Sequence, residues 1–141
     1  YRWRRNGTGI RGATASTYTP QIADAGRYLT VTVTPRRTGY TSTSATSARV
    51  GIPIYPTTRP YLRGTARAGR TMTVMVGAWT PRPTSYRYQW YRNNVAIKGA
   101  TAKTYTLRSA DRGAKVHAKV FAQRSGSPTG QRYTTRVTVA R

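Results

Sequence analysis

The chain has 141 residues, of which 25 are Lys or Arg and only two are acidic, giving a net charge of +23. It contains no Cys and a single His, which excludes a disulfide framework and a thiolate metal site and leaves little for acid–base chemistry. No run of the sequence approaches the roughly 18 apolar residues that a transmembrane helix needs. We therefore expect no catalytic residues, no metal and no cofactor.

The type of charge indicates the type of partner. Arg supplies 21 of the 25 basic residues, and its forked donors suit phosphate, sulfate and carboxylate groups. So basic a chain is a candidate for disorder. However, 25 Thr and 11 Tyr against three Leu favour strands, and regular alternation along the chain supports a folded protein.

An internal repeat organises the chain. Residues 1–33 align without a gap to residues 88–120, and sixteen of the 33 positions are identical. The shared segments include Tyr-x-Trp, Thr-Tyr-Thr and Ala-Asp-x-Gly. The chain therefore carries two copies of one unit, which we place at residues 1–56 and 57–141.

The two copies differ in length. The second has a lead-in, residues 60–87, ahead of its Tyr-x-Trp segment, whereas the first begins at that segment. We expect either that the natural chain extends upstream or that the first unit borrows its opening strands from another molecule. The initial Tyr in place of Met is typical of a processed chain or a fragment.

The lead-in and the centre of the second copy alternate as strands do. Residues 71–76 place Met72, Val74 and Val76 on one face, and residues 86–90 do the same with Tyr86, Tyr88 and Trp90. A hairpin turn is predicted at Asn93-Asn94. Its counterpart is Asn6-Gly7, and Asn-Gly is a strong signal for a two-residue hairpin. Asn6-Gly7-Thr8 also matches a glycosylation sequon, but we favour the turn.

The remaining strands follow in quick succession. We expect a return strand at 97–99, a strand at 104–107, a turn at 109–113 and a strand at 115–120 with Val116, Ala118 and Val120 inward. After a loop, a last strand is expected to place Tyr133, Thr135, Val137 and Val139 on one face. Short strands in close succession along residues 60–141 predict an all-β sandwich.

At these residues the sequence resembles a known pattern. Tyr-x-Trp-x-Arg-Asn at 88–93, Thr-Tyr-Thr-Leu at 104–107 and Ala-Asp-Arg-Gly at 110–113 resemble strands C and E and the E–F turn of an immunoglobulin-like (Ig-like) domain. More closely, both copies resemble bacterial Ig-like repeats at the C-termini of secreted hydrolases and surface proteins of high-GC Gram-positive bacteria. Gly64-Thr65-Ala66, Trp79-Thr80-Pro81 and Gly99-Ala100-Thr101 fit the same pattern.

The resemblance implies two tandem Ig-like β-sandwich repeats, the first lacking its opening strands. We expect residues 1–56 to hold strands C to G, so that 17–19 corresponds to the strand at 104–107, and residues 57–141 to form a complete repeat. It also implies a secreted or cell-surface accessory module and no catalysis. Two features depart from the Ig pattern. There is no disulfide between strands B and F, and Lys115 stands where a tyrosine corner would need Tyr. The tyrosine corner is therefore not transferred.

The few residues able to do chemistry have simpler interpretations. Asp24 and Asp111 occupy equivalent positions, where we expect each to hydrogen-bond a turn or pair with a nearby Arg. His117 falls on the outward face of its strand, where we expect a solvated side chain. A triad joining His117, Asp111 and Ser109 or Ser125 is not expected.

The basic residues form the most suggestive pattern. Strands C, F and G of an Ig-like sandwich share one sheet, and their outward positions carry many cations together with an aromatic ring. The candidate polyanion-binding residues are Arg2, Arg4, Arg36, Arg37, Arg87, Tyr91, Lys115, Lys119, Arg132 and Arg136.

Three functions remain open. The first is a non-catalytic module that holds a larger secreted protein on an anionic cell-wall polymer or acidic polysaccharide. The second is a spacer or structural subunit of an extracellular assembly, completed by strand donation from an upstream chain or a neighbouring subunit. The third is nucleic-acid binding independent of base sequence, because no sequence-reading motif is present.

Overall fold

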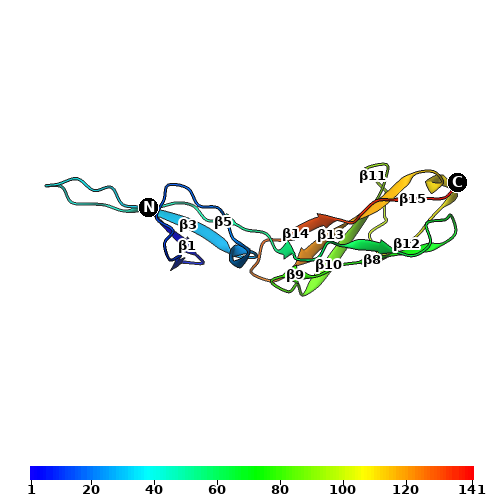
Figure 1. Cartoon of the computed structure of the whole chain (residues 1–141), viewed down its shortest axis with the longest axis horizontal. Coiled ribbons are helices and arrows are strands. Elements are labelled where there is room, and N and C mark those ends of the chain that lie inside the picture. The colour runs from blue at the N-terminus through cyan, green and yellow to red at the C-terminus, as the bar shows by residue number, and fades with distance from the viewer.

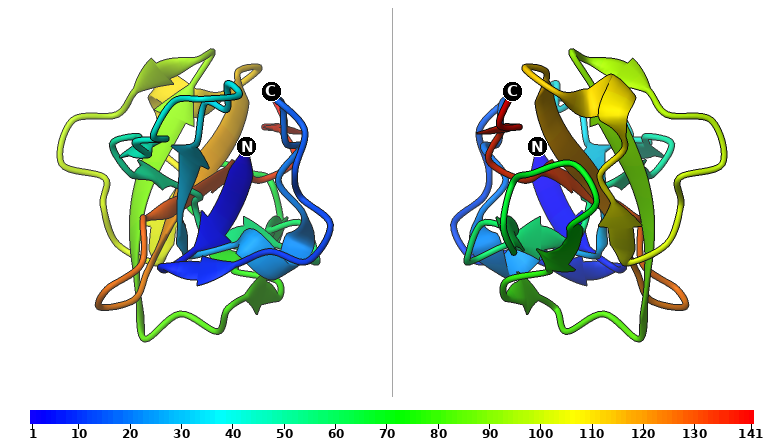
Figure 2. Two further views of the ribbon diagram at one scale, coloured as in Figure 1. Left: turned by 90° about the vertical axis from the view of Figure 1, so that its left-hand side faces the viewer. Right: turned by 90° about the vertical axis from the view of Figure 1, so that its right-hand side faces the viewer.

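The structure, a computed structural model, describes residues 1–141 and shows an elongated molecule with two units end to end (Figure 1). Viewed along the long axis, the two units lie one behind the other within a single outline (Figure 2). The fold is all-β, and its only helical segments are two single turns of 3₁₀ helix. No helix is both long enough and apolar enough to span a membrane.

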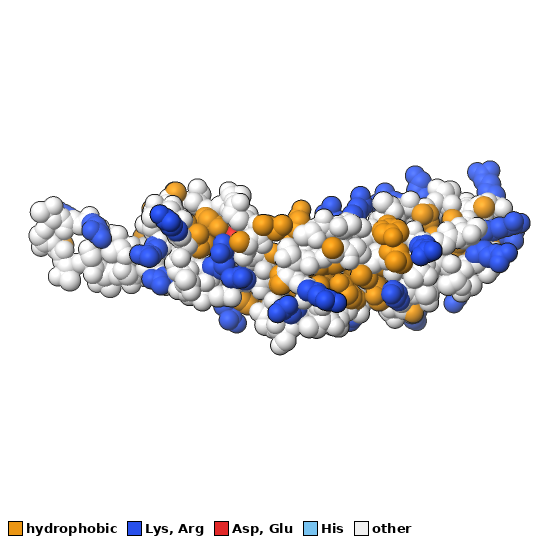
Figure 3. All heavy atoms as spheres, turned by 60° about the horizontal axis from the view of Figure 1, so that its bottom comes forward, with side chains coloured by type: hydrophobic (Ala, Val, Ile, Leu, Met, Phe, Trp, Pro, Cys, Tyr) orange, Lys and Arg blue, Asp and Glu red, His pale blue; other side chains and the backbone are white.

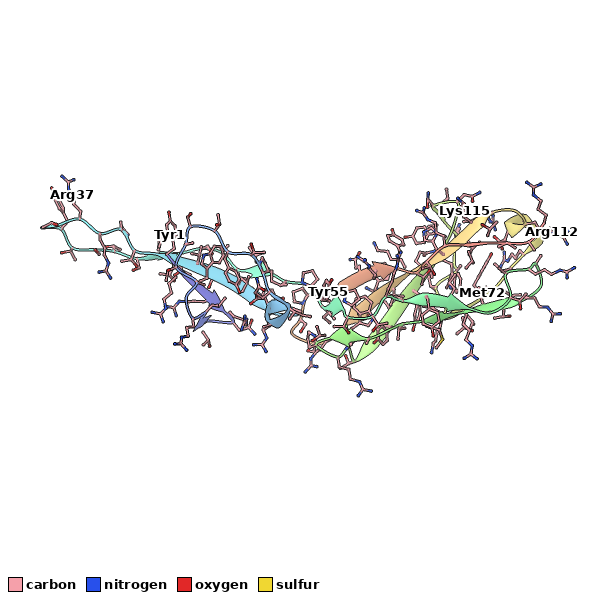
Figure 4. All side chains as sticks on the ribbon, in the orientation of Figure 1. Tyr1, Arg37, Tyr55, Met72, Arg112 and Lys115 are labelled. Atoms are coloured by element: carbon pink, nitrogen blue, oxygen red, sulfur yellow. The ribbon has the colours of Figure 1, made fainter.

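The first unit contains one antiparallel sheet in the order β2-β1-β3-β4, with β5 also paired to β3. Its elements are β1 (Arg2–Arg5), β2 (Thr8–Gly9), η1 (Ile22–Asp24), β3 (Tyr28–Val33), β4 (Ala45–Thr46) and β5 (Val50–Gly51). Between β3 and β4 a long loop projects from the end of the molecule, and Figure 4 labels Arg37 at its tip.

The second unit is a β-sandwich. Its elements are β6 (Tyr55–Pro56), β7 (Tyr61–Arg63), β8 (Thr71–Met75), β9 (Trp79–Thr80), β10 (Ser85–Arg92), β11 (Val95–Ala96), β12 (Thr104–Thr106), η2 (Ser109–Asp111), β13 (Lys115–Gln123), β14 (Gly130–Tyr133) and β15 (Val137–Thr138). One sheet runs β11-β10-β13-β14 with β15 on β13, the other runs β12-β8-β7, and β6 pairs with β9. The expected return strand at 97–99 lies two residues earlier, at β11.

The core of the second unit lies between its two sheets. It is a cluster of twelve buried residues to which β8 contributes Met72 and Val74 and β13 contributes Val116 and Val120. Trp90 of β10 is fully buried among them. The predicted alternation of β8, β10 and β13 is therefore confirmed, since every second side chain of a strand faces the same side of its sheet.

The first unit buries much less. Its only buried apolar residues are Ala25 and Leu29, while Trp3, the repeat partner of Trp90, is half-buried and Val33 is 37% exposed. The first unit has no second sheet, whereas in the second unit the sheet β12-β8-β7 covers the sheet β11-β10-β13-β14. This agrees with the expectation of a first repeat without its opening strands.

The junction between the units lies slightly earlier than the expected division after residue 56. Ile54 is buried in the core of the second unit, and β6 pairs with β9 of that unit. Ile54 N–H also donates to the Pro128 carbonyl at 3.1 Å. Residues 54–56 therefore belong structurally with the second unit.

The two hairpin turns form as predicted. Asn6 and Gly7 have φ values of 46° and 86°, and Asn93 and Asn94 have φ values of 46° and 69°. Positive φ at both central residues is the requirement of a type I′ hairpin, which Asn and Gly meet at the lowest steric cost.

A one-residue slip separates β14 from β15. Lys119 lies opposite Tyr133 in β14, but Val116 lies opposite Val137 in β15, one residue later than continuous pairing would give. The Thr134 hydroxyl fills the break, accepting from Ala118 N–H at 3.0 Å and donating to the Thr135 carbonyl at 2.9 Å. An extra residue of this kind turns the following side chains to the other face of the sheet.

Candidate anion-binding face

The outer face of the sheet β11-β10-β13-β14 carries alternating cations and aromatic rings. Directly paired residues point to the same side of a sheet. Arg87 pairs with Phe121, Gln89 with Lys119, and Tyr91 with His117. The intervening residues of both strands face the core, so these six face outward. The outward orientation predicted for Tyr91 and Phe121 is therefore confirmed.

Cations and rings on this surface contact one another. The Arg87 guanidinium lies 5.9 Å from the Phe121 ring centroid, and Lys119 Nζ lies 5.1 Å from Phe121 and 5.3 Å from Tyr133. Tyr91 stacks on His117 with centroids 5.2 Å apart, and Tyr133 meets both rings at 5.4–5.6 Å. We call this surface the basic–aromatic face; its residues are Arg87, Tyr91, Lys115, His117, Lys119, Phe121, Tyr133 and Arg136.

The orientation predicted for Arg132 is wrong. Arg132 pairs with Val120, a core residue, so it lies on the side opposite to Lys119. It lines a cavity at the junction of the units together with Pro53 and Tyr55. The outward position belongs instead to Tyr133, which was expected to face inward. The slip between β14 and β15 explains the error, because the prediction assumes that inward and outward side chains alternate without interruption from residue 132 to residue 139.

The candidate residues of the first unit fall into two separate places. Arg2 and Arg4 lie on the outer face of β1, opposite Thr32 and Thr30 of β3. Arg36 and Arg37 belong to the projecting loop, where the Arg37 guanidinium lies 4.6 Å from the Tyr40 ring centroid. Figure 4 shows Arg37 at the opposite end of the molecule from Lys115. The ten candidates therefore do not form one patch.

Each of the two acidic residues forms an ion pair with an Arg of its own unit. Asp111 is fully buried, and its oxygens accept from Arg92 Nε at 2.5 Å, the Tyr105 hydroxyl at 3.0 Å and Arg108 N–H at 2.7 Å. Burial opposes ionisation, but these hydrogen bonds outweigh it and hold the pKa of Asp111 below its ordinary 3.8. The predicted role in a turn and an ion pair is confirmed.

The first unit repeats this arrangement. Asp24 accepts from Arg5 Nε at 2.5 Å, from the Tyr18 hydroxyl at 2.9 Å and from Gln21 N–H at 2.6 Å. Its pKa is lowered by the same hydrogen bonds working against the same burial. With both carboxylates buried and paired, the net charge of +23 rests on side chains that have no carboxylate partner. Figure 3 shows Lys and Arg along the whole visible face and almost no acidic surface.

His117 is not solvated, contrary to expectation. Only 4% of it is exposed because Tyr91 and Tyr133 cover the ring, and its Nδ1 is buried without a hydrogen-bond partner. Burial, aided by the positive charge of Arg136, lowers the pKa of His117 below its usual value. No hydrogen bond joins it to Asp111 or to a serine, so a triad is not assembled.

Sequence reasoning missed three residues that lie beside His117. Arg59, Asn94 and Tyr133 line the same cavity of about 690 Å³. The repeat alignment held a usable signal. At the positions of Tyr91, His117 and Tyr133 the first copy has Arg4, Thr30 and Thr46, so the aromatic cluster is confined to the second unit.

Comparison with known proteins adds no relative. No protein-family model matches the chain, and no curated protein matches it.

Proposed function

We propose that the chain is a non-catalytic module that binds an anionic polymer, such as a cell-wall polymer or an acidic polysaccharide, through the basic–aromatic face of its second unit. In this proposal it is an Ig-like accessory segment that anchors a larger secreted or cell-surface protein. The observation that carries the proposal is the alternation of cations with rings on a surface that has no acidic side chain to neutralise it.

Physical arguments support a use for this charge. One-signed charge destabilises a folded protein by self-repulsion and attracts polyanions from a distance. The cations supply affinity for any charged backbone, whereas the rings supply flat apolar surface for sugar rings or bases to stack on. The test must therefore distinguish binding to nucleic acid from binding to a wall polymer or polysaccharide.

The test measures binding of the whole chain to a sulfated polysaccharide, a phosphate-containing wall polymer and duplex DNA, each over a range of salt. We expect the logarithm of the binding constant to fall steeply with the logarithm of salt concentration, by roughly 0.9 per neutralised charge as on duplex DNA. A flat salt dependence for all three polymers contradicts the proposal. Preference for DNA over both other polymers favours nucleic-acid binding instead.

A charge-matched pair of variants localises the surface. The triple variant R87A/K115A/K119A removes three cations from the basic–aromatic face, and R63A/R67A/R70A removes three from β7 and the loop that follows it. We expect the first to weaken binding at least tenfold and to reduce the salt slope by about 3, and the second to do much less. Equal losses would show that net charge alone binds the polymer.

We propose strand acceptance as a second function, because one observation favours it. Thr104–Thr106 is strand β12 through its pairing with β8, whereas the same sequence at 17–19 has no ladder partner and is not a strand. The open face of the first unit thus presents Trp3 and Tyr18 where the second unit is covered. We propose as occupant a strand pair of the β7–β8 type, with Thr alternating with apolar residues.

A synthetic peptide of residues 60–78, which spans β7 and β8 and contains no Trp, tests this function. We expect it to shift the Trp3 emission of the variant W79F/W90F to the blue and to protect amides 17–19 from exchange. A peptide of the same composition in scrambled order is the control. No response, or equal responses to both peptides, would refute strand acceptance.

A further inference from the structure

We infer that the cavity beside His117 is a specific subsite for one tetrahedral oxyanion, a phosphate or sulfate group of the bound polymer. Its lining includes Arg59, Tyr91, Asn94, His117, Tyr133 and Arg136. The inference rests on the proposed function for the polymer that brings the oxyanion, but none of the residues that line the cavity is removed by the charge-matched variants.

Hydrogen-bond donors line the cavity on several sides. Arg59 comes from the segment before β7, Arg136 from the break before β15 and Tyr133 from β14, so donors approach the cavity from separate elements. Arg59 uses only Nε within the chain, in a 3.4 Å hydrogen bond to the Tyr133 carbonyl, and Arg136 makes no hydrogen bond. Guanidinium groups with free donors on two sides suit an anion that accepts in several directions.

His117 has no hydrogen-bond partner for its buried Nδ1. A ring that is 96% buried, with Nδ1 lacking any partner, costs free energy unless something accepts its proton or donates to it. Rotation about χ2, which has two broad wells, lets the imidazole present either nitrogen to a ligand. A buried unpaired polar group that lines a cavity is the expected sign of a ligand that the cavity is built to hold.

All the charged groups around His117 are positive. The groups that face His117 are Tyr91 from β10, Lys115 and Lys119 from its own strand, Tyr133 from β14, and Arg136 and Arg59 at the cavity rim. None is acidic, and both carboxylates of the chain are held in the Asp24 and Asp111 networks. The site therefore concentrates positive charge with nothing inside the protein to balance it, and an oxyanion would supply that balance.

The two repeats differ at the positions that form this cavity. The first unit has Arg49 at the position of Arg136, but Thr30 and Thr46 at the positions of His117 and Tyr133. Thr30 and Thr46 cannot form an aromatic wall, and Arg49 instead lies 4.5 Å from the Tyr28 ring centroid. The subsite is a property of the second unit, and the first unit provides a built-in control.

The experiment uses the single His of the chain as its reporter. Inorganic phosphate, and separately sulfate, is added to the full chain at constant ionic strength while the imidazole signals of His117 are followed by NMR. We expect a saturable shift of these signals and a rise in the His117 pKa when the anion is bound, since the anion favours imidazolium. A shift that grows linearly without saturation, or that chloride reproduces, would overturn the inference.

Variants separate a built subsite from general attraction. R136A and R59A should each weaken phosphate binding at least tenfold, whereas R49A, with the same loss of charge at the equivalent position, should change it less than about twofold. Equal effects of R136A and R49A would overturn the subsite. If phosphate saturates at His117 but polymers do not bind, the subsite stands and the proposed function fails; the reverse result leaves polymer binding and removes the subsite.

Discussion

The two units share sixteen of 33 aligned residues and the same strand pairing, but they differ in what covers the sheet. In each, the Trp indole N–H donates to a carbonyl twelve residues later, Trp3 to Ala15 and Trp90 to Ala102, at 3.0 and 2.9 Å. The Trp–Tyr centroid distances are 5.5 and 5.4 Å. Yet Trp90 is fully buried and Trp3 is not. Local geometry is therefore set by the repeat itself, whereas burial is set by the second sheet.

The largest expected effect comes from removing the two tryptophans in turn. Trp90→Ala should destabilise the second unit by about 3–5 kcal/mol, because it leaves a cavity between two sheets. Trp3→Ala should cost the first unit only about 1–2 kcal/mol, since less area is withdrawn from water there. Urea unfolding followed by amide signals of each unit measures both values. Equal losses would contradict the contrast in burial.

In contrast to the tryptophans, we expect the two buried carboxylates to contribute equally to the stability of their units. Asp111→Asn and Asp24→Asn each leave an Arg without its partner. Breaking a buried pair costs about 3–5 kcal/mol, and we expect about 2–3 here because the Arg side chains are 32% and 25% exposed. A much larger loss for Asp111 would show that the second sheet strengthens the ion pair, which the matching geometry does not predict.

Sequence reasoning succeeded where the cause is local. The Asn-Gly and Asn-Asn turns, the alternation of β8, β10 and β13, and the bonds of Asp24 and Asp111 to turn amides all depend on neighbouring residues. The shared sheet of β10, β13 and β14 came instead from the Ig-like resemblance, which implies that strands C, F and G lie together. Together, these features predict the all-β fold class and place Arg87, Tyr91 and Lys119 on one face of the sheet.

The failures depend on interactions between distant segments. Thr17-Tyr18-Thr19 has the sequence of β12 but is not a strand, because a strand needs a ladder partner. Tyr133 faces outward and Arg132 faces inward, the reverse of the prediction, because of the one-residue slip between β14 and β15. Thr134 stabilises this slip, but a Thr in the sequence does not by itself predict one. The burial of His117 needed Tyr133 on its outer face, so the second error followed from the first.

As the pH falls, we expect the second unit to lose stability in two steps and the first unit in one. A His with a lowered pKa in the folded state is protonated more readily when unfolded, so its contribution is present above the unfolded pKa of about 6.5. That contribution is lost as pH falls through the lowered folded value. Only the second unit contains His117, and the equivalent Thr30 does not titrate. We expect this step in the second unit alone, and H117T should abolish it.

Both units should then lose stability at lower pH. The pKa values of Asp24 and Asp111 are lowered in the folded state, so their contribution is complete above the unfolded value of 3.8 and disappears as pH falls through the folded value. Urea midpoints measured in chloride from pH 8 to 2 reveal the two windows. A first unit that weakens already near pH 6 would contradict the assignment.

The smallest expected effect tests how the units are joined. Gly26 and Gly113 are repeat partners with φ values of +70° and +71°, so Ala costs each about 1 kcal/mol of backbone strain. Their surroundings differ. A Cβ at Gly26 would lie 2.7 Å from Pro81 Cγ and 3.1 Å from Ser127 Oγ of the second unit, whereas one at Gly113 would meet nothing closer than Arg141 Cγ at 3.8 Å.

Because the backbone strain is the same at both positions, any further difference between the variants reports the junction. Gly26→Ala must push Pro81 away, so we expect it to change the angle between the units and to shift amide signals around Pro81 and Ser127. Gly113→Ala should leave both unaltered. Small-angle scattering and residual dipolar couplings measure the angle. If the two variants keep the same inter-unit angle, the contact at Gly26 does not hold the units in line, and the elongated shape depends on the Ile54 and β6 contacts alone.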